Sequence, residues 1–236
     1  MNSIASARGR VLARLGLQNL VGVEPFEIAE AHFAHAQSLG SAGRYEVEGF
    51  SIEIPPGVYH PRPDSSSLMF VRNLLALNPL RVSRACEIGC GSGAVALFIA
   101  KHFAADVLAT DISEVALQAT RDNAASNGVA LRIHRSDLFD GVREGGFDLI
   151  VFNTPLVDLK PMTEWDGGTL CDPRGELLAR FVGEVGGYLA PDGVALFSLC
   201  SNSAYEHLDD APLCLRIVGF EIAGAGFWRA IVEARL

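Results

Sequence analysis

The stretch C-E-I-G-C-G-S-G, residues 86–93, indicates the class of fold. A short apolar run, residues 84–88, leads into it, and a run with helical spacing, residues 94–103, follows it. A strand, a glycine-rich turn and a helix in this order place backbone N–H groups and a helix N-terminus against a bound cofactor. Close approach of the cofactor requires residues without Cβ atoms, which are supplied here by Gly89, Gly91 and Gly93.

Two carboxylates beside the turn narrow the choice of cofactor. Glu87 lies inside the turn, where it favours a cationic or amine-bearing ligand and disfavours a pyrophosphate. Asp111 ends the next apolar run, at the position of a carboxylate that binds ribose hydroxyls. S-adenosylmethionine has an amino-acid end and a ribose but no phosphate, so both carboxylates suit it. The glycine spacing, with Ala94, also satisfies the dinucleotide pattern G-x-G-x-x-G/A, which keeps an NAD-dependent oxidoreductase as the least favoured alternative.

The composition favours one intracellular α/β domain. With 236 residues, 49% of them hydrophobic, the chain can bury a sizeable core and carry a short additional segment. A net charge of −9 gives no overall field that attracts nucleic acid or an anionic membrane, so we expect a small-molecule or peptide substrate. Five cysteines without a C-x-x-C pair favour reduced thiols, and no apolar run approaches a membrane span. These features predict a soluble, cytoplasmic protein that binds neither nucleic acid nor membrane.

From residue 84 onward, strand-like and helix-like runs alternate. This alternation predicts a parallel sheet with helices on both faces. The runs are 84–88, 94–104, 106–110, 113–127 and 130–134, then a buried strand at 147–152, a helix at 175–189, a strand at 193–199 and an antiparallel pair at 217–222 and 227–235.

The residues before this alternation predict a small helical cap over the mouth of the main fold. Residues 2–16 and 25–39 show helical spacing. His32 and His35 lie one turn apart in the second helix, but no acidic partner completes a metal-binding pattern, so surface or packing histidines are favoured. The predicted division is a cap at 1–43 and a cofactor-binding domain at 44–236.

A proline-rich segment leads into the main domain. Alternating apolar residues within 45–54 predict two short strands before it. In P-P-G-V-Y-H-P-R-P-D-S-S-S, residues 55–67, four prolines hold the chain extended, and a helix is predicted to follow at 66–78. A stiff linker explains the prolines, whereas an active-site wall also explains Tyr59 and Arg62. The sequence leaves both interpretations open.

Polar residues follow four successive predicted strands. They are Glu87 with Gly89, Asp111, Ser136 with Asp137, and Asn153. Ligands of open α/β sheets bind beyond the carboxyl ends of the strands, so we expect these residues to form one site. Asp137, in S-D-L-F, is placed to accept a hydrogen bond from an adenine amino group, with Ile112 and Leu138 placed to sandwich the adenine ring.

Together these motifs resemble those of class I S-adenosylmethionine-dependent methyltransferases. E-I-G-C-G-S-G resembles the glycine motif of that family, Asp111 its ribose carboxylate and S-D-L-F its adenine site. P-G-V-Y-H-P-R-P-D-S, F-D-L-I-V-F-N-T-P-L and W-D-G-G-T-L-C-D-P-R-G are more similar to the HemK/PrmC-like group. That group methylates glutamine amides of release factors or ribosomal protein and has relatives that act on other amino groups. The resemblance covers residues 45–200.

The resemblance implies an α/β fold with the Rossmann-like, seven-stranded, mostly parallel sheet of class I methyltransferases. It implies S-adenosylmethionine as the cofactor and no metal. The cofactor-binding residues that it implies are Glu87, Gly89, Cys90, Gly91, Gly93, Asp111, Ile112, Asp137, Leu138 and Asn153.

The chain departs from the N-P-P-Y signature of this group, because residues 153–156 read N-T-P-L. In the family, the Asn side-chain oxygen and the next backbone carbonyl accept hydrogen bonds from an NH₂ group and aim its lone pair at the methyl carbon. Asn153 is retained, and Pro155 still holds the Thr154 carbonyl extended. Leu156 replaces the stacking aromatic ring, which argues against a nucleobase and weakens the case for glutamine.

The expected catalytic residues are Asn153, Thr154, Pro155 and Tyr59. In-line methyl transfer requires the acceptor and the methyl group to be held about 3–3.5 Å apart with water excluded, and needs no nucleophilic triad. The candidates for a general base are Tyr59, His60 and Asp158.

The sequence leaves several functions open. The favoured one is a methyltransferase acting on a nitrogen of a small metabolite or peptide. The alternatives are a protein-glutamine methyltransferase of the release-factor type, a cyclising reaction on the aminobutyryl chain of S-adenosylmethionine with release of methylthioadenosine, and a cofactor-binding protein that regulates a partner without catalysis.

Overall fold

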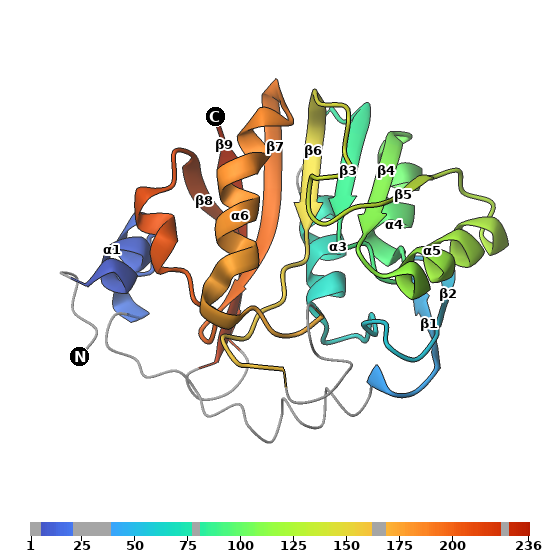
Figure 1. Cartoon of the computed structure of the whole chain (residues 1–236), viewed down its shortest axis with the longest axis horizontal. Helices are drawn as coiled ribbons and strands as arrows, with labels where there is room; N and C mark the ends of the chain where they lie inside the picture. The colour runs from blue at the N-terminus through green and yellow to red at the C-terminus, as the bar shows by residue number, and fades with distance from the viewer. Residues whose placement is uncertain (1–5, 21–38, 77–80, 162–168, 223–226) are drawn as a thin grey trace.

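A seven-stranded sheet forms the centre of the computed structural model, which describes residues 6–20, 39–76, 81–161, 169–222 and 227–236 (Figure 1). The strand order is β5-β4-β3-β6-β7-β9-β8. The pairs from β5 to β7 are parallel, and β9 runs antiparallel to both β7 and β8. The strands are β3 (Arg84–Ile88), β4 (Asp106–Asp111), β5 (Arg132–Arg135), β6 (Phe147–Phe152), β7 (Leu189–Cys200), β8 (Cys214–Ile222) and β9 (Trp228–Arg235).

Helices cover both faces of this sheet. On one face α3 (Ser66–Ala76), α4 (Ala94–Phe103) and α5 (Glu114–Ser126) share a hydrophobic core with Leu149 and Val151 of β6. On the other face α6 (Glu176–Glu184) packs over Ile150 and Phe152 of the same strand. In Figure 1, α6 lies in front of the sheet and α4 behind it. Because side chains alternate between the two faces of a strand, a strand that is buried on both faces is a continuous apolar run.

The predicted α/β fold with a mostly parallel sheet is therefore confirmed. The closing antiparallel pair is also present, as β8 and β9. The helix predicted at 175–189 is shorter than expected: α6 ends at Glu184, a 3-10 turn (η3) covers Val185–Gly187, and β7 begins at Leu189. The two consecutive glycines at 186 and 187 disfavour a longer helix because glycine loses the most backbone entropy in it.

A hairpin of β1 (Gly43–Val47) and β2 (Phe50–Ile54) precedes the sheet. Its two-residue turn has positive φ at both Glu48 and Gly49, the conformation that suits the twist of a tight hairpin. Two amides, one in α5 and one at the residue that caps its C-terminus, hold the hairpin against the main domain.

Asn123 and Asn127, one helical turn apart on α5, bind the backbone of β2 as a neighbouring strand would. The Glu53 N–H donates to Asn123 Oδ1, and Asn123 Nδ2 donates back to the Glu53 carbonyl, both at 2.9 Å. Asn127 makes the same pair of bonds with Ser51, at 3.0 and 2.9 Å. Asn123 Nδ2 also donates to the carbonyl of Ser92 in the glycine loop at 2.9 Å. One buried amide therefore joins the hairpin, α5 and the loop.

The first described helix, α1 (Ala7–Arg14), packs at the other end of the sheet. Val11 and Leu12 are buried in the same core as α6. Arg8 and Arg14 donate hydrogen bonds to backbone carbonyls of Ser203 and Leu208, around the 3-10 turn η4 (Glu206–Asp210). A short turn, η1 (Gln18–Leu20), follows α1.

Much of the predicted cap lies outside the described residues. This holds for residues 21–38, which include His32 and His35. The predicted boundary at residue 43 and the capping role both stay predictions. In the part of the chain that the structure describes, no helix has the length and apolar character needed to cross a membrane.

Replacement of Asn123 by Ala is expected to lower the free energy of unfolding by about 1–3 kcal/mol, because it leaves buried backbone groups of β2 and of the glycine loop without partners. The measurement is urea unfolding followed by circular dichroism. Gln118→Ala, which removes an exposed amide from the same helix, is the matched control. Equal midpoints for the two variants would contradict this role of Asn123.

Candidate cofactor and acceptor site

The four polar signals of the sequence lie at one edge of the sheet. Glu87 lies in β3 and Asp111 ends β4, whereas Asp137 and Asn153 come after β5 and β6. These four strands are consecutive neighbours and run parallel, so their carboxyl ends meet at that edge. The structure therefore places Glu87, Asp111, Asp137 and Asn153 along one side of the molecule, as the sequence predicted.

The glycine loop after β3 has the conformation that its composition requires. Gly89, Gly91 and Gly93 all have positive φ. A Cβ atom on Gly93 would also lie 2.9 Å from Cγ2 of Thr120 on α5, a distance that leaves no room for a side chain. The Thr120 hydroxyl donates to the Gly91 carbonyl at 3.0 Å. The loop is thus fixed against α5 as well as by its own turns.

Cys90 is a structural member of this loop. Its N–H donates to the Thr110 carbonyl at 2.8 Å, and its Sγ lies 3.3 Å from the Thr120 hydroxyl. Burial raises the pKa of the Cys90 thiol well above its usual value. The thiol is therefore protonated at neutral pH and serves packing.

Asp111, at the end of β4, connects two neighbouring turns. One carboxylate oxygen accepts from the Gly91 N–H and the other from the Ser113 N–H, each at 2.9 Å. Burial raises the pKa of Asp111, and the hydrogen bonds from Ser113 and Gly91 oppose this rise. The Ile112 N–H is a third donor to this carboxylate, and because a carboxylate has about four acceptor positions, at least one stays open to a ligand.

Glu87 is a buried carboxyl group at this edge, and one of its oxygens lacks a hydrogen bond within the described part of the chain. Its side chain is 2% exposed, and Oε2 has no hydrogen-bond partner among the described residues. Burial raises the pKa of Glu87 well above its usual value; the Ala96 N–H lowers it and the charge of Asp111 raises it further. A cationic group bound beside Glu87 would favour the ionised carboxylate.

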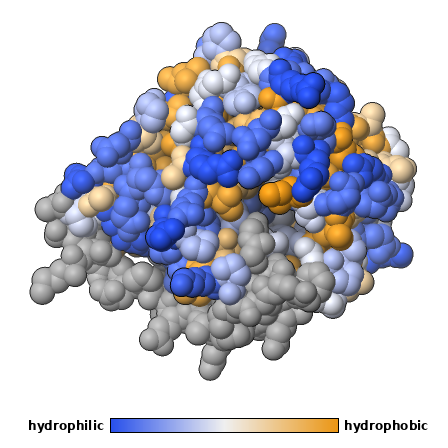
Figure 2. Space-filling model, viewed as in Figure 1, coloured by the Kyte–Doolittle hydropathy of each residue, from blue (hydrophilic) through white to orange (hydrophobic). Residues whose placement is uncertain are grey.

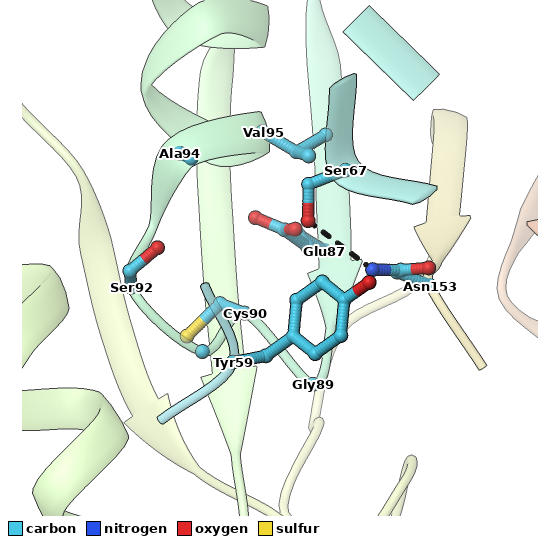
Figure 3. A pocket seen from close by; sticks show the side chains of 10 residues that line it. Tyr59, Ser67, Glu87, Gly89, Cys90, Ser92, Ala94, Val95 and Asn153 are labelled. Atoms are coloured by element: carbon cyan, nitrogen blue, oxygen red, sulfur yellow. Dashed lines mark hydrogen bonds between the residues drawn. The ribbon is translucent and has the colours of Figure 1, made fainter. Parts of the chain in front are cut away.

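A pocket opens between the glycine loop, the first turn of α3 and the end of β6 (Figure 3). The side chains of Tyr59, Ser67, Glu87 and Asn153 converge on it from four separate segments. Its lining residues are Tyr59, Ser67, Glu87, Gly89, Cys90, Gly91, Ser92, Ala94, Val95 and Asn153.

Tyr59 brings the proline-rich segment into the site. Its ring lines the pocket, and its hydroxyl lies 3.3 Å from the Ser66 hydroxyl at the start of α3. The segment therefore forms part of the pocket wall. His60 is buried away from the pocket, with its ring nitrogens 3.0 Å from the Tyr45 hydroxyl and 3.2 Å from the Ser41 carbonyl. Burial lowers the pKa of His60.

Asn153 follows β6 directly and holds its amide between α3 and β7. Nδ2 donates to the Ser67 hydroxyl at 3.3 Å, and Oδ1 accepts from the Ser198 hydroxyl at 3.2 Å. Thr154 is buried beside it. Asp158 lies further along, outside the pocket lining, and accepts a hydrogen bond from the Arg174 N–H at 2.6 Å.

The residues predicted to hold adenine lie beyond the lining of this pocket. Ile112 is 56% exposed, whereas Leu138 is buried in the core on the α6 side of the sheet. Asp137 is half-buried, and its Oδ1 accepts a hydrogen bond from Arg180 of α6 at 3.1 Å. Only the tertiary structure reveals Arg180, which also lies close to Asp140 and Glu184. The face of the molecule that Figure 2 shows carries many hydrophilic side chains.

The sequence profile of the methyltransferase small domain matches residues 49–166, half of the chain. A putative protein N5-glutamine methyltransferase of Methanocaldococcus jannaschii is 34% identical over 157 residues, which cover 63% of this chain and 75% of the relative. The chain belongs to the methyltransferase small domain family. It is a transferase that uses S-adenosylmethionine, as the sequence predicted.

Other relatives share a smaller part of their length with this methyltransferase. A release factor glutamine methyltransferase of Streptococcus pneumoniae is 29% identical over 190 residues, which cover 80% of this chain and 63% of that protein.

Among solved structures, a 16S rRNA N2 G1207 methyltransferase of T. thermophilus superposes with a TM-score of 0.63 at 21% identity, covering 83% of this chain and 50% of the other. A ribosomal protein L11 methylase of Lactobacillus delbrueckii gives 0.56 at 23% identity, covering 78% and 84%. These two structures support the Rossmann-like fold.

The residues at the pocket suit S-adenosylmethionine. This molecule carries positive charge on its sulfonium and ammonium groups, and the buried Glu87 Oε2 lacks a partner. The glycine loop supplies backbone without Cβ atoms, and Asp111 supplies acceptors for hydroxyl groups. Among the described residues, no group of three or more His, Cys, Asp or Glu side chains could hold a metal ion.

Replacement of Glu87 by Gln is expected to stabilise the methyltransferase in the absence of a ligand, and more so at high pH. A carboxyl group whose pKa is raised by folding stabilises the protein fully below its unfolded pKa, and this contribution is lost as the pH rises through the folded pKa. Gln cannot ionise, so the Glu87→Gln variant does not lose this stability as the pH rises. Melting temperatures at pH 5 and pH 8 measure the effect, and 1 kcal/mol corresponds to about 2–4 °C in a domain of this size.

Addition of S-adenosylmethionine at pH 8 is expected to make the wild type the more stable of the two proteins. The bound cation stabilises the ionised Glu87, whereas the Gln variant offers it no negative charge. The ligand should therefore raise the melting temperature of the wild type more than that of the variant. Parallel pH dependence of wild type and variant would show that Glu87 is already compensated in the folded chain.

Proposed function

We propose that this methyltransferase transfers a methyl group to the nitrogen of a planar amide, and that its acceptor is a glutamine side chain in a protein. The observation that carries the proposal is the Asn153 amide, held at the pocket by hydroxyl groups on two sides. An amide oxygen at this position can accept a hydrogen bond from the NH₂ group that is to be methylated and orient its nitrogen.

Each residue has a distinct task in this proposal. S-adenosylmethionine, when bound, supplies an electrophilic methyl group on its sulfonium. Glu87 provides a compensating negative charge, and Asp111 accepts hydrogen bonds from hydroxyl groups of the cofactor. Asn153 and the Thr154 carbonyl receive the two N–H groups of the acceptor, with Pro155 keeping that carbonyl extended. Tyr59 covers the pocket and excludes water from the reacting atoms.

The relatives favour glutamine over the small-metabolite nitrogen that the sequence alone favours. The M. jannaschii relative is described as acting on protein N5-glutamine, and those of S. pneumoniae and Lactococcus lactis as release factor glutamine methyltransferases. Relatives described as acting on ribosomal RNA and on ribosomal protein L11 also match. The absence of nucleic-acid binding therefore stays a prediction.

With a purified, unmethylated release factor as acceptor, we expect S-adenosylhomocysteine to form and one glutamine to gain a methyl group, located by tandem mass spectrometry. Free glutamine is the matched small-molecule acceptor, and S-adenosylmethionine alone is the blank. Methylation of free glutamine at a similar kcat/KM would support a small-metabolite enzyme instead. Accumulation of methylthioadenosine in the blank would replace methyl transfer with chemistry on the aminobutyryl chain.

Two substitutions separate cofactor binding from acceptor orientation in the same assay. Asp111→Ala should weaken S-adenosylmethionine binding by about 10- to 100-fold, because a charged hydrogen-bond acceptor is lost. Asn153→Ala should lower kcat by about 100-fold, because the acceptor is no longer oriented. Ser126→Ala, at an exposed position of α5, is the control. Cofactor affinity comes from calorimetry, and full activity of Asn153→Ala would exclude Asn153 as the orienting group.

A further inference from the structure

The side chain that departs from the N-P-P-Y signature has hydrogen bonds that a proline could not make. Thr154 is 4% exposed, and its hydroxyl donates to the Ser198 carbonyl at 2.6 Å. The same hydroxyl oxygen lies 3.0 Å from the Ser198 hydroxyl. Both Thr154 contacts reach β7, the strand beside β6. They join the loop that carries Asn153 to the neighbouring strand.

The hydroxyl of Ser198 continues this connection to the amide. It donates to Asn153 Oδ1 at 3.2 Å, while Asn153 Nδ2 donates to the Ser67 hydroxyl at 3.3 Å. Figure 3 shows the Ser67 end of this series, where the bond to Asn153 crosses the pocket beside Glu87. Thr154, Ser198, Asn153 and Ser67 thus form one hydrogen-bonded series that runs from β7 to α3.

This series restrains the Asn153 amide from two sides. Ser198 is 1% exposed and Thr154 is buried, so water does not compete for their hydroxyl groups. With its proton given to the Ser198 carbonyl, Thr154 can only accept from the Ser198 hydroxyl. The one Ser198 proton is then shared between Thr154 and Asn153 Oδ1. The amide oxygen keeps a second acceptor position, which is available to a substrate N–H.

We infer that Thr154 and Ser198 are positioning residues for Asn153, and that their hydrogen bonds replace the rigidity that the first proline gives to N-P-P-Y. A proline restrains the backbone through its fixed φ. Here the restraint comes from a side chain bound to the adjacent strand. The inference rests on the proposed function only in the clause that Asn153 orients the acceptor; the fixed amide itself is a property of the free protein.

Thr154→Val and Thr154→Ser form a matched pair for the test. Valine keeps the shape of threonine and removes the hydroxyl, whereas serine keeps the hydroxyl and removes the methyl. Ser198→Ala removes the other member of the series. Melting temperatures of all variants, with Ser126→Ala as the exposed control, establish that each one is folded.

The first readout needs no acceptor. In protein labelled with ¹⁵N, the Asn153 side-chain NH₂ resonance is assigned by its loss in Asn153→Ala. We expect its chemical shift to change in Thr154→Val and Ser198→Ala and its exchange with water to become about tenfold faster, because the amide loses its fixed orientation. Thr154→Ser should keep the wild-type resonance. An unchanged resonance in both Thr154→Val and Ser198→Ala would overturn the inference, whatever the acceptor proves to be.

The second readout uses the release factor assay. Thr154→Val and Ser198→Ala should lower kcat by about 10- to 100-fold, with little change in the KM for S-adenosylmethionine, because a misdirected acceptor slows only the transfer step. Thr154→Ser should recover most of what Thr154→Val loses. If Asn153→Ala is inactive while Thr154→Val and Ser198→Ala retain full kcat, the positioning role is wrong and the proposed function stands. If Asn153→Ala is fully active, the proposed role of Asn153 in orienting the acceptor is itself wrong.

Discussion

The bonds from Asp111 to two backbone N–H groups hold the site together. This carboxylate joins the glycine loop after β3 to the turn after β4 through Gly91 and Ser113. Those turns start α4 and α5, so the start of each helix is fixed relative to the other. In the proposed function the same carboxylate also accepts hydrogen bonds from hydroxyl groups of the cofactor. One side chain would then support the loop in the free protein and bind the ligand.

Beside this bridge lies a carboxyl group that is unfavourable to ionise in the free protein. Glu87 is buried, and one of its carboxylate oxygens lacks a hydrogen-bond partner among the described residues. Such a group lowers the stability of the free fold when it is ionised. It also gives the site an affinity for a cation that a neutral pocket would not have. The pocket is therefore arranged for a ligand with positive charge, and S-adenosylmethionine meets this condition.

The acceptor side is arranged by neutral groups. Ser67, Thr154 and Ser198 surround Asn153 with hydroxyls from α3, the loop after β6 and β7. Hydroxyl groups donate and accept, so they can fix an amide without adding charge beside the methyl-transfer site. In the proposed function, carboxylates serve the cofactor and hydroxyls serve the acceptor, and this division accounts for a chain that carries N-T-P-L and still keeps the asparagine of N-P-P-Y.

Local patterns in the sequence predict several parts of this protein. The glycine loop, the strand-helix alternation and the carboxylates at strand ends each depend on neighbours within a few residues, so pattern and spacing predict them. The family followed from the same motifs. The length of α6 was overestimated, because the apolar spacing continues through the glycine pair at 186 and 187.

The tertiary structure shows which distant side chains lie at the site. Ser198 lies 45 residues from Asn153 and Ser67 lies 86 residues from it, and no local pattern connects them. The contact of Asn123 with β2 and that of Arg180 with Asp137 have the same character. A lone serine or asparagine is compatible with many environments, and the strand order of the sheet selects one. The spacing of residues therefore predicts the glycine loop, whereas the folded chain places the hydroxyl groups around Asn153.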